Sequence, residues 1–197
     1  MTSSIHLAET AKRRDFNLKK VLILGFCFIA LLLCFVFYKT NYTSTIEEAA
    51  NKANIQYDEI YQAMNIKNRV LVFYGLDEEE VFSVGVLKKD WLGYKWIMGS
   101  GSAQVNNFDA PVSLAMANLP SENRDDVDIY ISVAFGTIYQ NEIEKLNVIY
   151  EDQHIKPAVI IETKLGRKWF SLSDNPISGD PQIIGLNKDG EEIFKNY

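Results

Sequence analysis

The chain has 197 residues and a net charge of −6, a length that leaves room for one ordinary domain plus a short appendage. The charge is uneven: residues 1–38 carry +3, whereas residues 39–197 carry −9, with 15 basic and 24 acidic side chains. An acidic domain argues against nucleic acid as a partner, because phosphate binding needs a basic surface. It also argues against the domain lying on an anionic membrane surface.

The N-terminal part combines a basic tail, residues 1–20, with an apolar run over residues 21–38 that contains no charge. A helix of that length would span roughly 27 Å, close to the thickness of the hydrocarbon core of a bilayer. The sequence therefore predicts one transmembrane helix over 21–38. The excess of positive charge before it predicts a cytoplasmic N-terminus and an extracytoplasmic domain, which makes the chain a single-pass protein of the cell membrane.

Two alternatives for this segment concern processing. A cleavable signal peptide has a shorter apolar region followed by a small-x-small site, and Lys39–Thr40–Asn41–Tyr42 offers none. A lipoprotein signal needs a small residue before its cysteine, but Leu33 precedes Cys34, and the apolar run continues past that cysteine. Both cysteines, Cys27 and Cys34, are better interpreted as apolar residues of an uncleaved signal anchor. Cleavage of the anchor is left open.

A short polar linker over 39–44 leads to a predicted helix. Ser44 or Thr45, followed three residues later by Glu47 or Glu48, forms a capping-box pattern. Apolar residues then recur at steps of three and four, which places them on one helical face. They are Ile46, Ala50, Ala53, Tyr57, Ile60 and Met64. The run is short for a coiled coil, so we expect the helix to pack on its own domain.

Beyond residue 68 the pattern is that of strands. Segments 69–76, 81–89 and 94–101 predict a three-stranded meander, and a short helix is expected between Pro111 and Pro120. Segment 127–135 alternates cleanly, which predicts a strand half buried in an antiparallel sheet. Further strands are predicted over 143–151, 158–163, 168–173, 182–187 and 191–197, the last two joined by a Lys188–Asp189–Gly190 turn. The predicted fold of residues 45–197 is an α+β domain, with a helix packed on a mainly antiparallel β-sheet.

Few residues of the domain offer catalytic or metal chemistry. His154 is its only histidine, and a Ser-His-Asp arrangement would have to use it with Asp152 or Glu151 nearby. The neighbours of His154 favour a solvated loop instead. Carboxylates gather at 125–128 and 187–192, but neither segment follows the spacing of a calcium loop. We therefore predict no catalytic residues, no metal site and no cofactor.

One segment stands out as a candidate for ligand binding. It is a basic and aromatic cluster at a predicted hairpin, in which Trp91, Tyr94 and Trp96 lie beside Lys88, Lys89 and Lys95. The candidate binding residues are Lys88, Lys89, Trp91, Tyr94 and Trp96. Such a tip can bind an anionic or sugar-containing polymer by ring stacking and charge. The alternative is structural, with Trp96 packed inward, Trp91 covering a turn and the lysines solvated.

The anchor and two further stretches, "VGVLKKDWLGYKWIMGSGS" and "IIETKLGRKWFSL" with "IIGLNKDGEEI", resemble uncharacterised single-pass membrane proteins of endospore-forming Gram-positive bacteria. The resemblance implies the topology given above, but no activity and no site residues. The expected function is a non-enzymatic interaction or envelope-associated role, with another envelope protein or a wall polymer as partner. A binding module for a wall polymer or small ligand is the alternative, and a hydrolase is a third. The oligomeric state is left open.

Overall fold

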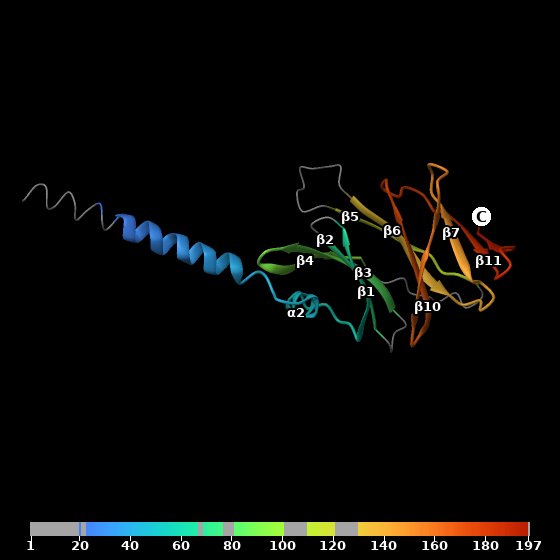
Figure 1. Cartoon of the computed structure of the whole chain (residues 1–197), viewed down its shortest axis with the longest axis horizontal. Helices are drawn as coiled ribbons and strands as arrows, with labels where there is room; N and C mark the ends of the chain where they lie inside the picture. The colour runs from blue at the N-terminus through green and yellow to red at the C-terminus, as the bar shows by residue number, and fades with distance from the viewer. Residues whose placement is uncertain are drawn as a thin grey trace, which may run out of the picture. The chain divides into compact units, whose positions relative to one another are not determined.

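The structure is a computed structural model that describes residues 20, 23–66, 69–76, 81–100, 110–120 and 130–196. The chain divides into two compact units, Met1–Thr43 and Ser44–Tyr197 (Figure 1). Each unit is described below by itself.

The first unit contains a helix over residues 23–39 whose large apolar side chains are mostly exposed, Phe26 and Phe37 by 74% each. Across the residues that the structure describes, no helix combines the length and the apolar character needed to cross a membrane. The prediction of a transmembrane signal anchor over 21–38 is therefore wrong by this structure. The first two residues of that segment, Val21 and Leu22, lie outside the described residues.

The second unit is built from three antiparallel sheets, which we call the first, second and third sheet. Strand order in the first sheet is β1 (Glu59–Ile66), β2 (Arg69–Leu76), β3 (Val81–Asp90) and β4 (Gly93–Gly99). The second sheet has the order β5 (Ala115–Pro120), β6 (Tyr130–Ile138), β10 (Gly166–Ser173) and β9 (Val159–Thr163). The third has the order β12 (Glu192–Lys195), β11 (Gln182–Leu186), β7 (Lys145–Ile149) and β8 (Ile155–Pro157).

The second sheet lies between the other two, because both of its faces are packed. One face meets the first sheet in a core of stacked rings, in which Phe73 lies 4.2 Å from Phe170 between ring centroids. The other face meets the third sheet around Trp169, with Leu146 and Ile183 opposite. Figure 1 shows this order of sheets, from the green strands β1–β4 to the orange and red strands β7 and β11.

Strand β6 shows why alternation alone misjudged this layer. Val133 and Phe135 lie in the core with the first sheet, as the alternating pattern predicts. The alternate residues of the strand face the third sheet, where Ala134 and Ile138 are buried as well. The strand is thus buried on both faces over most of its length, so the prediction of a half-buried strand is wrong. Small side chains on the second face leave room for the large Trp169 next to it.

The predicted helix over residues 45–64 is also wrong in its second half. Helix α2 covers only Ile46–Lys52, and Thr45 caps it by accepting a hydrogen bond from the Glu48 N–H, as expected. Asn54 then takes the left-handed conformation (φ 55°), and the Ile55 N–H bonds back to the Ala50 carbonyl at 3.0 Å. These are the marks of a helix stop with asparagine in place of glycine.

After that stop the chain continues as β1, so Ile60 and Met64 are strand residues. Helix α2 packs through Ala49 over the outer face of the first sheet, in a third cluster with Val70, Val72 and Leu87. With one described helix of seven residues, the domain is mainly antiparallel β. The predicted α+β class is corrected accordingly.

Most predicted strands are confirmed. Segment 69–76 is β2, and β2, β3 and β4 form the expected meander. The turn before β12 is confirmed as a hairpin, in which Gly190 has a φ of 82°. The short helix expected after Pro111 is wrong, because Ala115–Pro120 pairs residue by residue with β6 as β5.

Candidate functional site

The β3–β4 hairpin presents Trp91 at its tip. Asp90 pairs with Gly93 across the turn, and the Leu92 N–H donates to Asp90 Oδ1 at 2.8 Å. Gly93 has a φ of 122°, a conformation that residues with a side chain rarely adopt. This turn leaves the Trp91 side chain 80% exposed.

The two other aromatic residues of the predicted cluster are anchored beneath the tip. Tyr94 and Trp96 lie on the outer face of the first sheet, where they pack against the cluster that includes α2. The Trp96 ring meets Tyr74 edge-on, with centroids 5.7 Å apart. The Lys89 ammonium lies 5.5 Å from the Tyr94 ring centroid and donates to Asn65 Oδ1 at 3.3 Å. Trp96 is therefore a structural residue, as its alternative interpretation proposed.

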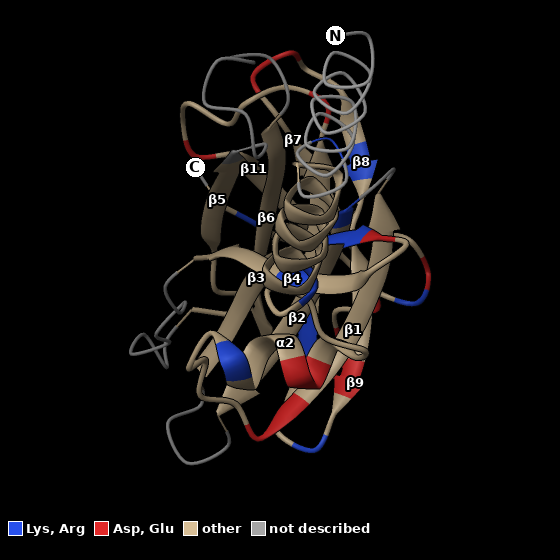
Figure 2. Ribbon diagram, turned by 90° about the vertical axis from the view of Figure 1, so that its left-hand side faces the viewer, with Lys and Arg blue, Asp and Glu red and all other residues tan. Residues whose placement is uncertain are grey.

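Lys88 lies on the opposite face of the sheet from Lys89. The strand register places Lys88 between Arg69 on β2 and Lys95 on β4, so three cationic residues form one row across three strands. Arg69 and Lys88 are half-buried, and Lys95 is exposed. We call this set the cationic row. In Figure 2 blue segments lie close to the labels of β2 and β4.

The predicted cluster is therefore divided between two faces and a tip. Arg69 was missing from it, and Lys95 was noted beside the rings but not named as a binding residue. Like charges directly opposite one another in a sheet are unfavourable, so the cationic row has no stabilising role as a set of cross-strand pairs. Arg69 could have been found from the registers of the β2–β3 and β3–β4 hairpins, because together they place Arg69, Lys88 and Lys95 opposite one another. The row stands out because the part of the chain after residue 38 carries a net charge of −9.

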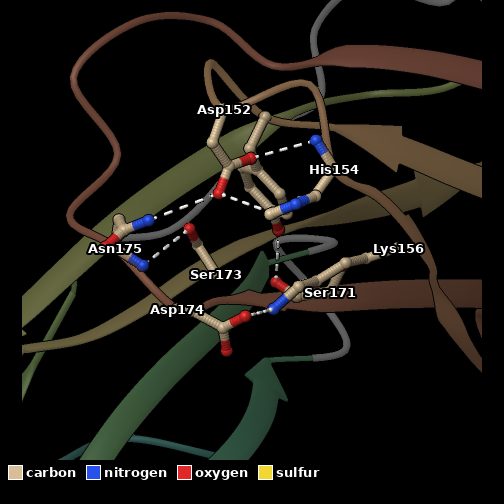
Figure 3. A network of polar contacts seen from close by, with 8 residues as sticks. Asp152, His154, Lys156, Ser171, Ser173, Asp174 and Asn175 are labelled. Carbon is tan, nitrogen blue, oxygen red and sulfur yellow. Dashed lines mark hydrogen bonds and ion pairs between the residues drawn. The ribbon is translucent and has the colours of Figure 1, made fainter.

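A second polar group surrounds His154 (Figure 3). Asp152 accepts the His154 N–H at 3.1 Å and lies 3.2 Å from His154 Nδ1, and Asn175 Nδ2 donates to the same carboxylate at 3.3 Å. The His154 N–H is the main reason that the pKa of Asp152 is lowered. The His154 side chain is 75% exposed, and in the described part of the chain no serine hydroxyl reaches it. These hydrogen bonds link the segment of Asp152 and His154 to the segment of Asn175, and the described residues around His154 do not form a Ser-His-Asp triad.

Tyr150, which lies beside this group, gives a pH prediction. Burial raises the pKa of Tyr150 and of Tyr74, so the folded state favours the neutral phenol of each. This contribution to stability is complete below the unfolded pKa of about 10 and is lost as the pH rises through the folded pKa. We expect an alkaline absorbance titration to show a late-ionising component, and Tyr150→Phe and Tyr74→Phe each to reduce it. A single wave near the ordinary tyrosine pKa would contradict this.

The carboxylates of residues 187–192, which the structure describes, do not form a metal site. Within the described residues, no three His, Cys, Asp or Glu side chains are placed to hold a metal ion. Residues 125–128 lie outside the described residues. In the other segment, Asn187 Oδ1 accepts the N–H groups of Asp189 and Glu191, both at 2.9 Å, which is turn chemistry.

No protein-family model, curated protein or solved structure matches this chain. The resemblance to membrane proteins of endospore-forming bacteria therefore stays a prediction. The hairpin tip and the cationic row are defined by geometry alone.

Proposed function

We propose that the domain Ser44–Tyr197 is a non-catalytic binding module that holds an anionic polymer at the β3–β4 hairpin. The observation that carries this proposal is Trp91, an aromatic side chain that is 80% exposed at the tip of the β3–β4 hairpin. A tryptophan ring at a hairpin tip offers a large apolar surface, with a polar N–H, that a ligand can cover. An extracytoplasmic location, and with it a wall polymer as ligand, stays a prediction from the charge asymmetry.

The fixed turn favours binding because little conformational entropy remains to be lost. The Asp90 side chain and the positive φ of Gly93 hold the turn before any ligand arrives. Pre-organisation of this kind improves affinity by lowering the cost of ordering. The Trp91 ring then offers a flat face on which a sugar ring or an apolar group can stack.

The cationic row supplies the charge that an anionic polymer needs. Neighbouring strands lie about 5 Å apart, so Arg69, Lys88 and Lys95 form a row of positive charges roughly 10 Å long. The row runs across the strands. An extended chain with regularly repeated anions fits this direction better than a compact ligand does.

The test measures binding of the chain to immobilised dextran sulfate, with neutral dextran as the blank. We expect Trp91→Ala to weaken binding by about tenfold, which equals ~1.4 kcal/mol. Lys88→Gln with Lys95→Gln should also weaken binding and flatten its dependence on salt, because screened charge contacts are removed.

The matched control removes the same charge elsewhere, with Lys145→Gln and Lys188→Gln on exposed positions of the third sheet and its last turn. This control should bind dextran sulfate nearly as the parent chain does. Equal losses in the two double variants would show that net charge alone governs binding, and unchanged binding by folded Trp91→Ala would remove the hairpin from the site.

A further inference from the structure

The outer face of the third sheet carries apolar residues that lie outside every buried cluster of the described chain. The inner face of this sheet is packed, because Leu146, Val148 and Ile183 lie in the core with Trp169. The residues that alternate with them on β7 and β11 point to the other side of the sheet. Three of these outward residues are apolar, and a fourth apolar residue lies beside them on β8. They are Ile149, Ile184 and Leu186, with Ile155 opposite Ile149.

The first sheet shows how an outer face of this domain is covered. Helix α2 packs there with Tyr94 and Trp96 and makes a buried cluster of its own. In Figure 1 the third sheet lies at the other end of the domain from β1–β4. There Ile155 is 61% exposed, and the other three apolar residues are half-buried without belonging to a cluster. Exposed apolar surface rimmed by charged residues is typical of a site where another protein docks.

One row of charged and apolar residues across this face determines which partner fits it. The register places Leu186 between Lys145 on β7 and Glu192 on β12. Residues opposite one another in antiparallel strands have side chains on the same face, so these three form a row, which we call the outer row. The backbones of Lys145 and Glu192 are roughly 10 Å apart, two strand spacings. Both side chains are exposed, and within the described residues neither forms an ion pair.

The outer row is complementary to a second copy of itself. Two third sheets can face each other about a two-fold axis that runs along β11, which brings Leu186 onto Leu186 of the partner subunit. Lys145 of each copy then lies opposite Glu192 of the partner subunit, so both charges are paired. A two-fold interface needs this kind of self-complementary surface, in which one residue meets another and the reverse contact forms as well.

The next row of the face fits the same axis. Ile184 lies at its centre, between Asn147 on β7 and Lys195 on β12. Across the axis the Lys195 ammonium meets the amide oxygen of Asn147 of the partner subunit, which is an uncharged acceptor. Neither row sets like charges against each other, so a second copy covers the face without repulsion.

We propose that the outer face of the third sheet binds a second copy of this chain, in a two-fold dimer with β11 at its centre. Antiparallel sheets commonly pack face to face with nearly aligned strands, about 10 Å apart. The three strands that overlap outline roughly 250 Å², less than the ~800 Å² per partner of a standard stable interface, so the dimer is weak. We expect a dissociation constant of about 0.1 mM. Polymer binding at the β3–β4 hairpin can be measured at about 1 µM chain, where the domain is monomeric, so the two proposals fail separately.

Cross-linking at a chosen position tests the dimer in the full chain. Cys27→Ser and Cys34→Ser remove the two natural thiols, and Leu186→Cys then places a single thiol beside the two-fold axis. At about 0.2 mM chain, a short bismaleimide should join two chains through position 186. Lys164→Cys in the same background is the matched control, because it puts the thiol on the exposed β9–β10 turn, outside the third sheet. Equal cross-linking at the two positions would overturn the proposal.

Reversing charges of the outer row tests whether the partner is a second copy. In the Leu186→Cys chain, Lys145→Glu or Glu192→Lys alone should lower cross-linking by about tenfold or more, because each sets like charges opposite one another twice. Mixing the two variants should restore it, since each mixed pair of chains regains both lysine–glutamate contacts. Lys164→Glu reverses an equal charge outside the face and should change nothing. A mixture that stays as weak as its components would overturn the proposal, because a different partner on this face does not respond to the exchange.

Discussion

Replacing Trp169 by alanine is expected to destabilise the domain by about 3–5 kcal/mol, the usual cost of removing a large ring from a packed core. Trp169 is fully buried between the second and third sheets. Its indole Nε1 also donates to the Ser113 carbonyl at 3.1 Å. The substitution leaves both a cavity and an unpaired carbonyl. Since small domains are stable by only about 5–15 kcal/mol, the variant should lie close to unfolding at ordinary temperature.

Denaturant unfolding followed by circular dichroism measures this loss. Trp169→Phe keeps a ring but not the donor, so it should cost less, about 2 kcal/mol. Trp91→Ala is the matched control: the same substitution at an exposed tryptophan should change the free energy of unfolding by less than about 0.5 kcal/mol. A similar loss for Trp91→Ala and Trp169→Ala would contradict the assignment of Trp169 to the core between the sheets.

The sequence predicted the strands well where local chemistry decides them. Segment 69–76 is rich in branched and aromatic residues, and β2 has those bounds. The Asp189–Gly190 pair marks a turn that only a few residue types allow, and a hairpin forms there. In such places the secondary-structure preference of a few neighbouring residues agrees with the final structure.

The predictions failed where distant packing outweighs a local pattern. Ile60 and Met64 continue the helical spacing of α2, but pairing with β2 makes them strand residues after the stop at Asn54. The 115–120 segment looked helical between two prolines, yet β6 offers it a ladder partner. Burial of β6 on both faces follows from a third sheet, which no window of β6 itself can reveal.

The candidate site was predicted in part for the same reason. The sequence grouped Trp91, Tyr94 and Trp96 with three nearby lysines. Strand pleat sends Lys88 and Lys89 to opposite faces, and the register adds Arg69. A pocket of about 500 Å³ at the end of the second sheet was not predicted at all. Its lining comes from β6, β9, β10 and the segments that follow β6 and β9, and the pairing of β6 with β10 joins segments far apart in the chain.

Gly136→Ala is the second substitution from which we expect a large effect. Gly136 pairs with Trp169 across the β6–β10 ladder, and a Cβ atom there would lie 2.0 Å from the Ser113 carbonyl oxygen. Ser113 cannot move away cheaply. Its N–H donates to the Thr137 carbonyl at 2.9 Å, and its Oγ accepts the Thr137 N–H at 2.8 Å. We expect a loss of about 3 kcal/mol in the free energy of unfolding, at the upper end for overpacking by one methyl group.

The control for this substitution is Gly179→Ala, where the added atom would meet only the flexible end of Glu151, so the loss should stay below about 1 kcal/mol. A double-mutant cycle then tests the mechanism. Gly136→Ala should displace the Ser113 carbonyl that Trp169 binds, so it removes the same hydrogen bond that Trp169→Phe removes. The combined loss should therefore fall short of the sum of the single losses by about 1 kcal/mol. Strictly additive losses would contradict this mechanism. They would mean that Gly136 makes room for the Ser113 backbone without affecting the hydrogen bond from Trp169, so that the glycine and the tryptophan stabilise the second sheet independently.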